Sequence, residues 1–278
     1  IPLMIVIGRR LFTDKIYTIE EFKKLTTLPS VGIIPKKPSS YVNVVTENPQ
    51  SPISEVFNTI RGNLQYYLLG KKNSTILITS FEPNEGKTFT SVNLAASYAS
   101  NYRVILLEFD LRISSDIYNE IEPEDKGKGL SEYLIMNAEL DEIIRQSTLE
   151  NLDVIRAGEI PPNPVALIST KRTEELFETL RKQYDYIIID TPPYALVSDP
   201  FILMQYADLK LLVNRIGHIR RKTFKSNMES IEQKKVQDIY HVINDVKNFK
   251  GSYSTYIYSE KRSRRSFFRF IKRSSASQ

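Results

Sequence analysis

One strand–loop–helix segment constrains the fold of this chain more than any other part of its sequence. Residues Thr75–Thr79 form a β-branched, apolar run of strand length, and Ser80–Thr88 follows it directly. A helical pattern then runs from Phe89 to Ser100 with small apolar residues on one stripe. Because loop amides and a helix N-terminus converge on an anion in this arrangement, the segment predicts a phosphate loop.

The loop ends in Gly86, Lys87 and Thr88, the order of a Walker A motif. The glycine lets the backbone approach the phosphates, the lysine reaches the β and γ oxygens, and the threonine hydroxyl binds Mg²⁺. The usual motif opens with glycine, whereas this chain has Ser80, another small residue. The surrounding strand and helix favour a phosphate loop over a chance Gly-Lys-Thr. The loop residues that we expect to bind the nucleotide are Asn84, Glu85, Gly86, Lys87, Thr88 and Phe89.

Two further apolar strands end in carboxylates. The run from Val104 leads into Glu108 and Asp110, and the run from Tyr186 leads into Asp190, where two prolines stop the strand. In doubly wound sheets, ligands bind at the carboxyl ends of the strands. The carboxylates and the phosphate loop are therefore expected along one edge, where a carboxylate holds Mg²⁺ directly or through water. A helix or turn cap is the alternative for Asp190 taken alone.

The rest of the chain alternates strand and helix patterns. Strand-like runs are expected at 31–35, 152–156, 208–214 and 239–244, and helices at 55–69 (capped by Ser54), 164–183 and 220–236. This repeated order predicts a doubly wound α/β fold with a mainly parallel sheet. Asn244 ends the last strand, where its amide is placed to meet a nucleobase; an ordinary turn-forming asparagine is the alternative.

The net charge of +5 comes from the end of the chain. Seven basic residues lie between 261 and 273, which leaves 31 basic against 33 acidic residues in 1–260. A nucleic-acid-binding protein is expected to carry a basic face on its folded part, so no nucleic-acid partner is predicted. The absence of cysteine excludes disulfides and cysteine-ligated metal sites.

The two ends of the chain differ from its middle. Ile1–Ile7 is apolar and is followed by Gly8-Arg9-Arg10, which favours the cytoplasmic end of a transmembrane helix over a buried edge strand. The basic tail is either solvated or in contact with anionic lipid. We therefore expect the end of a transmembrane helix at 1–10, a juxtamembrane connector at 11–52, a phosphate-loop domain at 53–250 and a flexible, tyrosine-containing basic tail at 251–278.

Together these motifs resemble the cytoplasmic kinase domain of bacterial protein-tyrosine kinases, the BY-kinases of capsule and exopolysaccharide co-polymerase systems. Ser80–Thr88 looks like the family's Walker A motif, Ile105–Arg112 its Walker A′ and Tyr186–Asp190 its Walker B. Residues 55–64 are similar to the helix before Walker A, and 157–164 form a further family-like segment. The resemblance covers nearly the whole chain and implies a P-loop NTPase fold of the deviant-Walker, ParA/MinD-like kind.

The resemblance implies an ATP- and Mg²⁺-dependent protein-tyrosine autokinase at the cytoplasmic face of the cell inner membrane, regulating exopolysaccharide or capsule synthesis or export. The implied partners are other copies of the chain, polysaccharide export and polymerase proteins, and a cognate tyrosine phosphatase. The copies would form a ring in which the tail of one enters the site of its neighbour. A carboxylate of the Walker A′ strand would accept or orient the tyrosine proton. The implied catalytic residues are Lys87, Glu108, Asp110 and Asp190. The nucleotide-binding set also includes Arg112 and Asn244, and the metal ligands would be Thr88, Asp110 and Asp190. The candidate phosphoacceptors are Tyr253, Tyr256 and Tyr258.

The chain departs from the family pattern at several positions. Glu108 stands where aspartate is usual, Asn58 stands where the oligomerisation helix usually has arginine, Ser80 replaces the leading glycine, and the tail tyrosines are few. If Glu108 is a displaced proton acceptor, Glu108→Asp is expected to raise autophosphorylation. Two alternative functions stay open: a ParA/MinD-like ATPase, which usually has an extra lysine where this chain has 82–85, and a non-catalytic ATP-binding scaffold.

Overall fold

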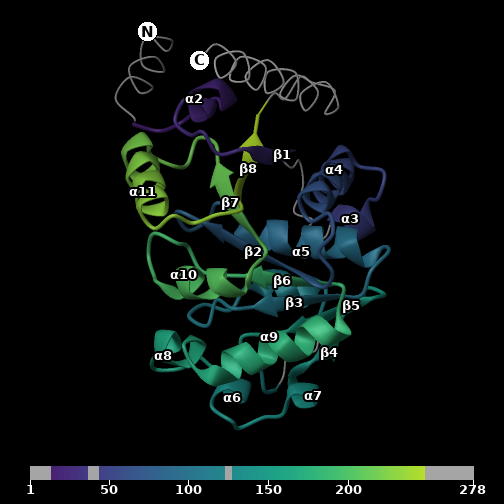
Figure 1. Ribbon diagram of the computed structural model, residues 1–278. Coiled ribbons are helices and arrows are strands. Elements are labelled where there is room, and N and C mark those ends of the chain that lie inside the picture. The colour runs from purple at the N-terminus through teal and green to yellow at the C-terminus, as the bar shows by residue number, and fades with distance from the viewer. Residues whose placement is uncertain (1–13, 37–43, 123–126, 248–278) are drawn as a thin grey trace, which may run out of the picture. The chain divides into compact units, whose positions relative to one another are not determined.

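The computed structural model describes residues 14–36, 44–122 and 127–247, which contain one eight-stranded sheet. Its order is β1-β8-β7-β2-β6-β3-β5-β4, and every neighbouring pair is parallel except β4 with β5 (Figure 1). The expected stub at 1–10 and the tail at 251–278 lie outside the described residues. The strands are β1 (Ser30–Pro35), β2 (Ser74–Ser80), β3 (Val104–Glu108), β4 (Arg145–Gln146), β5 (Leu152–Ile155), β6 (Tyr186–Asp190), β7 (Leu209–Arg215) and β8 (Ile239–Val246).

The central strands are buried on both faces. Every residue of β2 and β3 is buried, as are four of the five residues of β6. A strand covered by helices on both sides has no solvent face, so its sequence is a continuous apolar run rather than an alternating one. This is why the predicted runs in the sequence match these strands, and the predicted mainly parallel α/β fold is confirmed.

Helices cover both faces of the sheet. Right-handed crossovers that advance along the sheet in opposite directions place α4 and α5 on one face and α9, α10 and α11 on the other (Figure 1). No helix within the described ranges is long and apolar enough to cross a bilayer. The α-helices are α2 (Ile19–Lys23), α3 (Val44–Glu47), α4 (Pro52–Tyr67), α5 (Lys87–Ala99), α6 (Leu130–Leu134), α7 (Leu140–Ile143), α8 (Pro164–Ile168), α9 (Lys171–Gln183), α10 (Asp199–Leu203) and α11 (Arg221–Gln233), and the 3₁₀-helices are η1 (Asp116–Glu120) and η2 (Met204–Tyr206).

Two predicted helices have different bounds from those expected. Helix α4 is capped by Ser51, whose hydroxyl accepts the Ser54 amide, because Pro52 fits the first helical position. The helix expected at 164–183 is broken after α8. There the Ser169 hydroxyl donates to the Val165 carbonyl and the Thr170 hydroxyl to the Leu167 carbonyl, and such side-chain bonds compete with continued helix.

The segment before α4 joins the sheet. Strand β1, within the expected connector, is the edge strand beside β8. Helix α2 begins after Thr18, whose hydroxyl accepts the Glu21 amide. His241 of β8 is fully buried beneath this segment: its Nδ1 donates to Asn214 Oδ1 at 2.7 Å, and its Nε2 accepts from the Thr26 hydroxyl at 3.1 Å. Burial lowers the pKa of His241 to about 3, which keeps the ring neutral and suits this pattern.

The central sheet should carry most of the stability. Leu106 of β3 is completely buried, so we expect Leu106→Ala to lower the free energy of unfolding by about 2–5 kcal/mol through lost packing and the cavity left behind. Leu69→Ala, at a side chain that is 74% exposed, is the matched control and should change it by less than about 0.5 kcal/mol. Urea denaturation measures both; equal effects would contradict the described sheet.

Candidate active site

The carboxyl ends of three neighbouring strands form the candidate site. Strand β6 lies between β2 and β3, and in the strand register Asp190 stands beside Ile78 on one side and Glu108 on the other. The phosphate loop follows β2, and Asp110 follows β3 two residues later. The predicted phosphate loop and the predicted carboxylates are thus brought to one edge of the sheet.

The N-terminus of α5 suits an anion. Helix α5 begins at Lys87, with no side-chain cap on Gly86 and no acidic residue in its first turn. The amide ends of an uncapped helix and a lysine at its first position attract a phosphate. Gly86 has φ +95°, and a Cβ there would lie 2.2 Å from Asn244 Nδ2, so the loop conformation requires glycine.

Glu85 holds the phosphate loop from the inside. Its buried carboxylate accepts hydrogen bonds from the amides of Phe81 (2.9 Å), Glu82 (2.8 Å) and Arg215 (3.1 Å). Burial raises the pKa of Glu85 to about 7, although these bonds favour the charged form. Glu85 and its neighbour Asn84 were both expected to bind nucleotide; the Glu85 side chain faces the protein, so its contribution is confined to the backbone.

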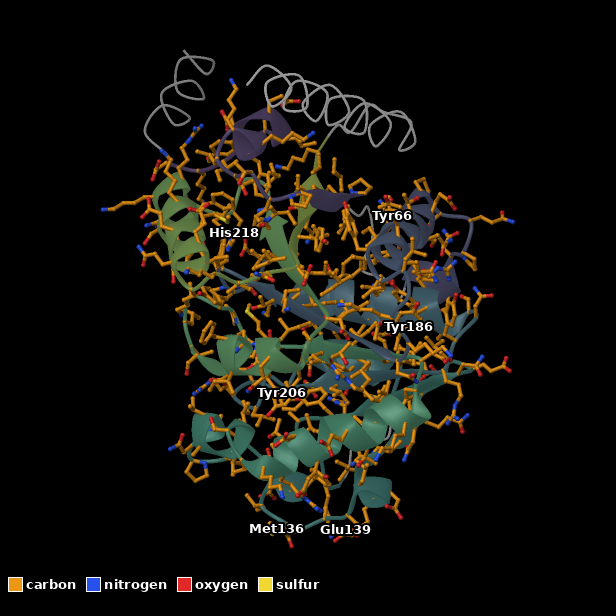
Figure 2. All side chains as sticks on the ribbon, in the orientation of Figure 1. Tyr66, Met136, Glu139, Tyr186, Tyr206 and His218 are labelled. Carbon is orange, nitrogen blue, oxygen red and sulfur yellow. The ribbon has the colours of Figure 1, made fainter. Side chains whose placement is uncertain are left out.

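The ends of β7 and β8 and the loop between β7 and α11 support the phosphate loop from outside. Arg215 donates from Nη1 to the Asn84 carbonyl at 3.2 Å, and its Nε pairs with Asp245 at 2.9 Å. His218, between β7 and α11 (Figure 2), places Nε2 3.0 Å from the Pro83 carbonyl. Asn244 donates to the Glu85 carbonyl at 2.8 Å. The amide predicted to meet a nucleobase therefore contacts the phosphate loop.

Phe89 and Arg112 were also predicted to bind nucleotide, and both side chains have protein partners. Phe89 is buried against the ring of Phe57. Arg112 forms a bidentate ion pair with the fully buried Asp199 of α10, at 2.9 and 3.1 Å. The Arg112 side chain is about one third exposed, so it stays at the site surface while Asp199 fixes its direction.

The charge of Lys87 acts on both Asp190 and Asp110. Asp190 is buried, accepts from the Ser91 hydroxyl (3.1 Å) and the Tyr118 hydroxyl (3.1 Å), and has its pKa raised to about 6 by burial. Burial also raises the pKa of Asp110, while the charge of Lys87 opposes the shift at both residues. Asp110 Oδ1 is buried and has no hydrogen-bond partner among the residues that the structure describes.

This donor set suits magnesium that is shared with a nucleotide. No group of three or more acidic or histidine side chains in the described part of the chain could hold a metal by itself. Mg²⁺ typically keeps several waters and binds one or two carboxylates plus substrate phosphates. Asp110, Asp190 and the Thr88 hydroxyl, next to an anion-binding helix end, fit that role.

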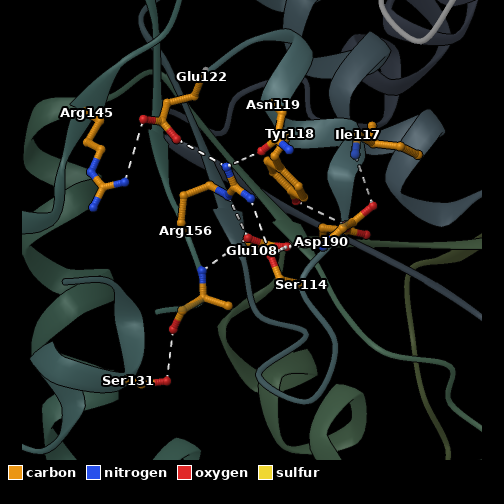
Figure 3. A network of polar contacts seen from close by, with 12 residues as sticks. Glu108, Ser114, Ile117, Tyr118, Asn119, Glu122, Ser131, Arg145, Arg156 and Asp190 are labelled. Atoms are coloured by element: carbon orange, nitrogen blue, oxygen red, sulfur yellow. Dashed lines mark hydrogen bonds and ion pairs between the residues drawn. The ribbon is translucent and has the colours of Figure 1, made fainter. Parts of the chain in front are cut away.

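Glu108 has other partners. Its carboxylate is 1% exposed and forms an ion pair with Arg156, the residue that follows β5, at 2.9 Å (Figure 3). Arg156 also pairs with Glu122 at 3.2 Å, and Glu122 contacts Arg145 at 3.6 Å. The residues predicted to meet here from sequence were Glu108 and Asp190. Five residues of this region were not predicted from the motifs: Arg156, Glu122, Tyr118, Ser91 and Asp199. The available signal for Arg156 was a basic residue at the end of the strand-like run 152–155.

The three predicted phosphoacceptors, Tyr253, Tyr256 and Tyr258, lie outside the described residues. The structure therefore describes the residues predicted to bind nucleotide, and both their roles and the acceptor stay predictions.

Comparisons with known proteins agree with this geometry. A family model described as an AAA domain matches residues 73–214. The tyrosine-protein kinase CpsD of Streptococcus pneumoniae serotype 4 is 37% identical over 180 residues, covering 64% of this chain and 78% of that protein. The kinase domain of the Escherichia coli tyrosine kinase ETK superposes with a TM-score of 0.73 at 29% identity, covering 84% of this chain and 95% of that one. MinD from Pyrococcus horikoshii, solved with Mg-ADP, has the same fold at 22% identity and a TM-score of 0.51, covering 62% and 69%.

Gly86→Ala should weaken nucleotide binding. The new methyl group must collide with Asn244, and the backbone must leave its positive φ, so we expect the affinity for Mg-ADP to fall at least about tenfold. Gly62→Ala in α4 is the matched control: nothing lies within 4 Å of its added Cβ, and the helix should gain up to about 1 kcal/mol. Calorimetric titration checks both, and unchanged affinity in Gly86→Ala would refute the described loop.

Glu85 should make stability depend on pH. Its folded-state pKa of about 7 lies above the ordinary 4.5, so the folded chain binds more protons than the unfolded chain between these values. The unfolding free energy of the wild type, relative to Glu85→Gln, should therefore fall as pH rises from 4.5 to 7, by at most about 1.4 kcal/mol per pH unit. Denaturation across this range tests it, with the exposed Glu150→Gln as control; parallel curves for wild type and Glu85→Gln would show the prediction to be wrong.

Proposed function

This chain belongs to the bacterial tyrosine-protein kinases, and we propose that it is an ATP-dependent autokinase whose acceptor tyrosines lie in its own C-terminal tail. One observation carries the proposal. The uncapped start of α5 with Lys87, and the carboxylates Asp110 and Asp190, meet at a single sheet edge in a chain 37% identical to a named tyrosine kinase. Phosphoryl transfer depends mainly on alignment and charge stabilisation, which this edge supplies.

Each residue of the site has a distinct part in the proposed reaction. Lys87 and the backbone amides of the phosphate loop bind the β and γ oxygens of ATP. Thr88, Asp110 and Asp190 would hold Mg²⁺, which when bound neutralises charge on the phosphates. Arg112 and the backbone at Asn84, Glu85 and Phe89 border the nucleotide, and Asn244 keeps the loop in its binding shape.

The acceptor is a tyrosine of another copy. The phenolic oxygen of Tyr253, Tyr256 or Tyr258 bonds to the γ-phosphorus, the bond from that phosphorus to the bridging oxygen breaks, and ADP leaves. A carboxylate at the end of β3 or just after it, Glu108 or Asp110, accepts or orients the phenolic proton. We propose that copies assemble in a ring, because the family resemblance implies a tail that enters the neighbouring site.

The cellular setting follows from the ends of the sequence and from the resemblance. The apolar run that precedes Arg9 and Arg10 supports a tether at the cytoplasmic face of the inner membrane. The basic, phenylalanine-containing tail supports contact with anionic lipid. We propose that phosphorylation regulates polysaccharide synthesis or export, with the export and polymerase proteins and a cognate phosphatase as partners.

Lys87→Met should abolish tail phosphorylation. Removing the phosphate-binding lysine should lower phosphotyrosine formation at least about a hundredfold, because the transferred phosphoryl group loses a charge that stabilises it. Lys71→Met is the control, since Lys71 is half exposed and pairs with Asp208 at the far ends of the strands. Incubation with Mg-ATP, followed by mass spectrometry and by an assay of released ADP, measures both products.

The same experiment separates the alternatives. Phosphotyrosine at Tyr253, Tyr256 or Tyr258 that disappears in Lys87→Met supports the autokinase. Release of ADP without phosphotyrosine would favour a ParA/MinD-like ATPase, and neither product would leave an ATP-binding scaffold.

A further inference from the structure

We infer that Glu108 is an anchoring carboxylate that does not meet the acceptor tyrosine, and that Arg156 is a positioning residue for the active site. The inference rests on the proposed kinase function and deepens it, because it decides which of the two carboxylates, Glu108 at the end of β3 or Asp110 after it, faces the reaction. It comes from the contacts around Glu108, all of which lie within the described residues (Figure 3).

Both oxygens of Glu108 are occupied. Oε2 accepts from Arg156 Nε at 2.9 Å and from the Ala157 amide at 3.2 Å. Oε1 accepts from the Ser115 amide at 2.9 Å and from the Ser114 hydroxyl at 3.4 Å. A carboxylate offers about four lone-pair positions, and with 1% of the side chain exposed none is open to a phenolic hydroxyl. The extra methylene of glutamate thus carries the carboxylate into the protein.

Arg156 balances the charge of this region. Its side chain is 3% exposed and lies between Glu108 and Glu122, and Arg145 contacts the other oxygen of Glu122. Two acidic and two basic side chains therefore form a neutral group. A buried carboxylate without a partner is strongly unfavourable, so Glu108 is kept in place by Arg156 and is unavailable to a metal or a phosphate.

Arg156 also fixes the wall of the site. Its guanidinium donates to Ser114 Oγ (3.3 Å) and Asn119 Oδ1 (3.3 Å) and lies over the ring of Tyr118, 5.1 Å from its centroid. Tyr118, within η1, donates its hydroxyl to Asp190. Arg156 therefore acts on Asp190 through Tyr118, without touching the nucleotide site itself.

Asp110 is left as the reactive carboxylate of this strand end. Backbone hydrogen bonds from Arg112 and Ile113 reach its carboxylate, but Oδ1 has no partner among the described residues, whereas each oxygen of Glu108 has two. Glu108, at the position where the family pattern has its first aspartate, is therefore structural in this chain. Asp110, at the second position, is the one that faces the phosphates and the acceptor.

The first test measures kcat and the KM for ATP in Glu108→Gln and Glu108→Asp. Loss of a proton-accepting group typically lowers a rate by about 10²–10⁴-fold. For an anchor, we expect kcat of Glu108→Gln to fall by less than about tenfold. Glu108→Asp should not exceed the wild type, because its shorter side chain moves away from Arg156. A hundredfold loss of kcat in a Glu108→Gln variant that unfolds cooperatively and keeps its KM, or a Glu108→Asp variant faster than wild type, would overturn the inference.

The second test is a double-mutant cycle with Arg156→Met. Alone, this change leaves Glu108 without a cation and Glu122 with Arg145 only. We expect kcat to fall and the unfolding equilibrium constant to rise, each at least about tenfold. Adding Glu108→Gln removes the uncompensated charge at position 108, so kcat and the stability should each be partly recovered. If Arg156→Met alone does not fold, the double variant should yield folded protein. A double variant no better than Arg156→Met would refute the anchor. Wild-type protein without phosphotyrosine would instead overturn the proposed kinase function, and the coupling in stability would still test the anchor.

Discussion

Repulsion between buried carboxylates is the constraint on which this site depends. Glu108 and Asp190 are side by side in the strand register and almost completely buried, and Glu122 lies close behind Glu108. Such groups stay ionised inside a protein only when cations or hydrogen-bond donors compensate them. Arg156 does this for Glu108 and Glu122, whereas Asp190 has the hydroxyls of Tyr118, Ser91 and Thr88 and the nearby charge of Lys87. The uncompensated side of the edge is therefore the one that faces the phosphate loop.

The phosphate loop shows a related balance between rigidity and attraction. The Glu85 carboxylate binds amides of the phosphate loop, and Arg215 at the end of β7 binds Glu85 and a loop carbonyl. The shape of the loop is therefore set before an anion arrives. Preformed donors cost little reorganisation when charge develops on the transferred group. Meanwhile α5 offers no acidic side chain that would compete with a phosphate at its start. The same buried glutamate that shapes the loop has its own pKa raised by burial.

Much of the fold could be predicted from sequence because buried parallel strands have continuous apolar sequences. The ends of β2, β3 and β6 carry the Gly-Lys-Thr loop, Asp110 and Asp190, so their meeting at one edge followed from the doubly wound pattern. The long-range ion pairs did not. The ion pairs of Arg156 with Glu108 and of Arg112 with Asp199 join residues that are distant in sequence, and no local pattern specifies which strands become neighbours. The helix break at 169–170 depends on hydroxyls that also occur within unbroken helices. The role of Glu108 was open for the same reason, because its partner lies 48 residues away.

The Glu108–Arg156 pair also has an evolutionary consequence. Because the two opposite charges are buried against each other, a change at position 108 or 156 alters which residues the other position tolerates. The two possible orders of substitution differ in their cost to stability. A lineage that loses Arg156 first passes through a chain in which the buried Glu108 has no cation and Glu122 keeps Arg145 only, whereas one that loses Glu108 first keeps Arg156 paired with Glu122. Descendants that exchange this pair for another are therefore expected to have changed residue 108 before residue 156.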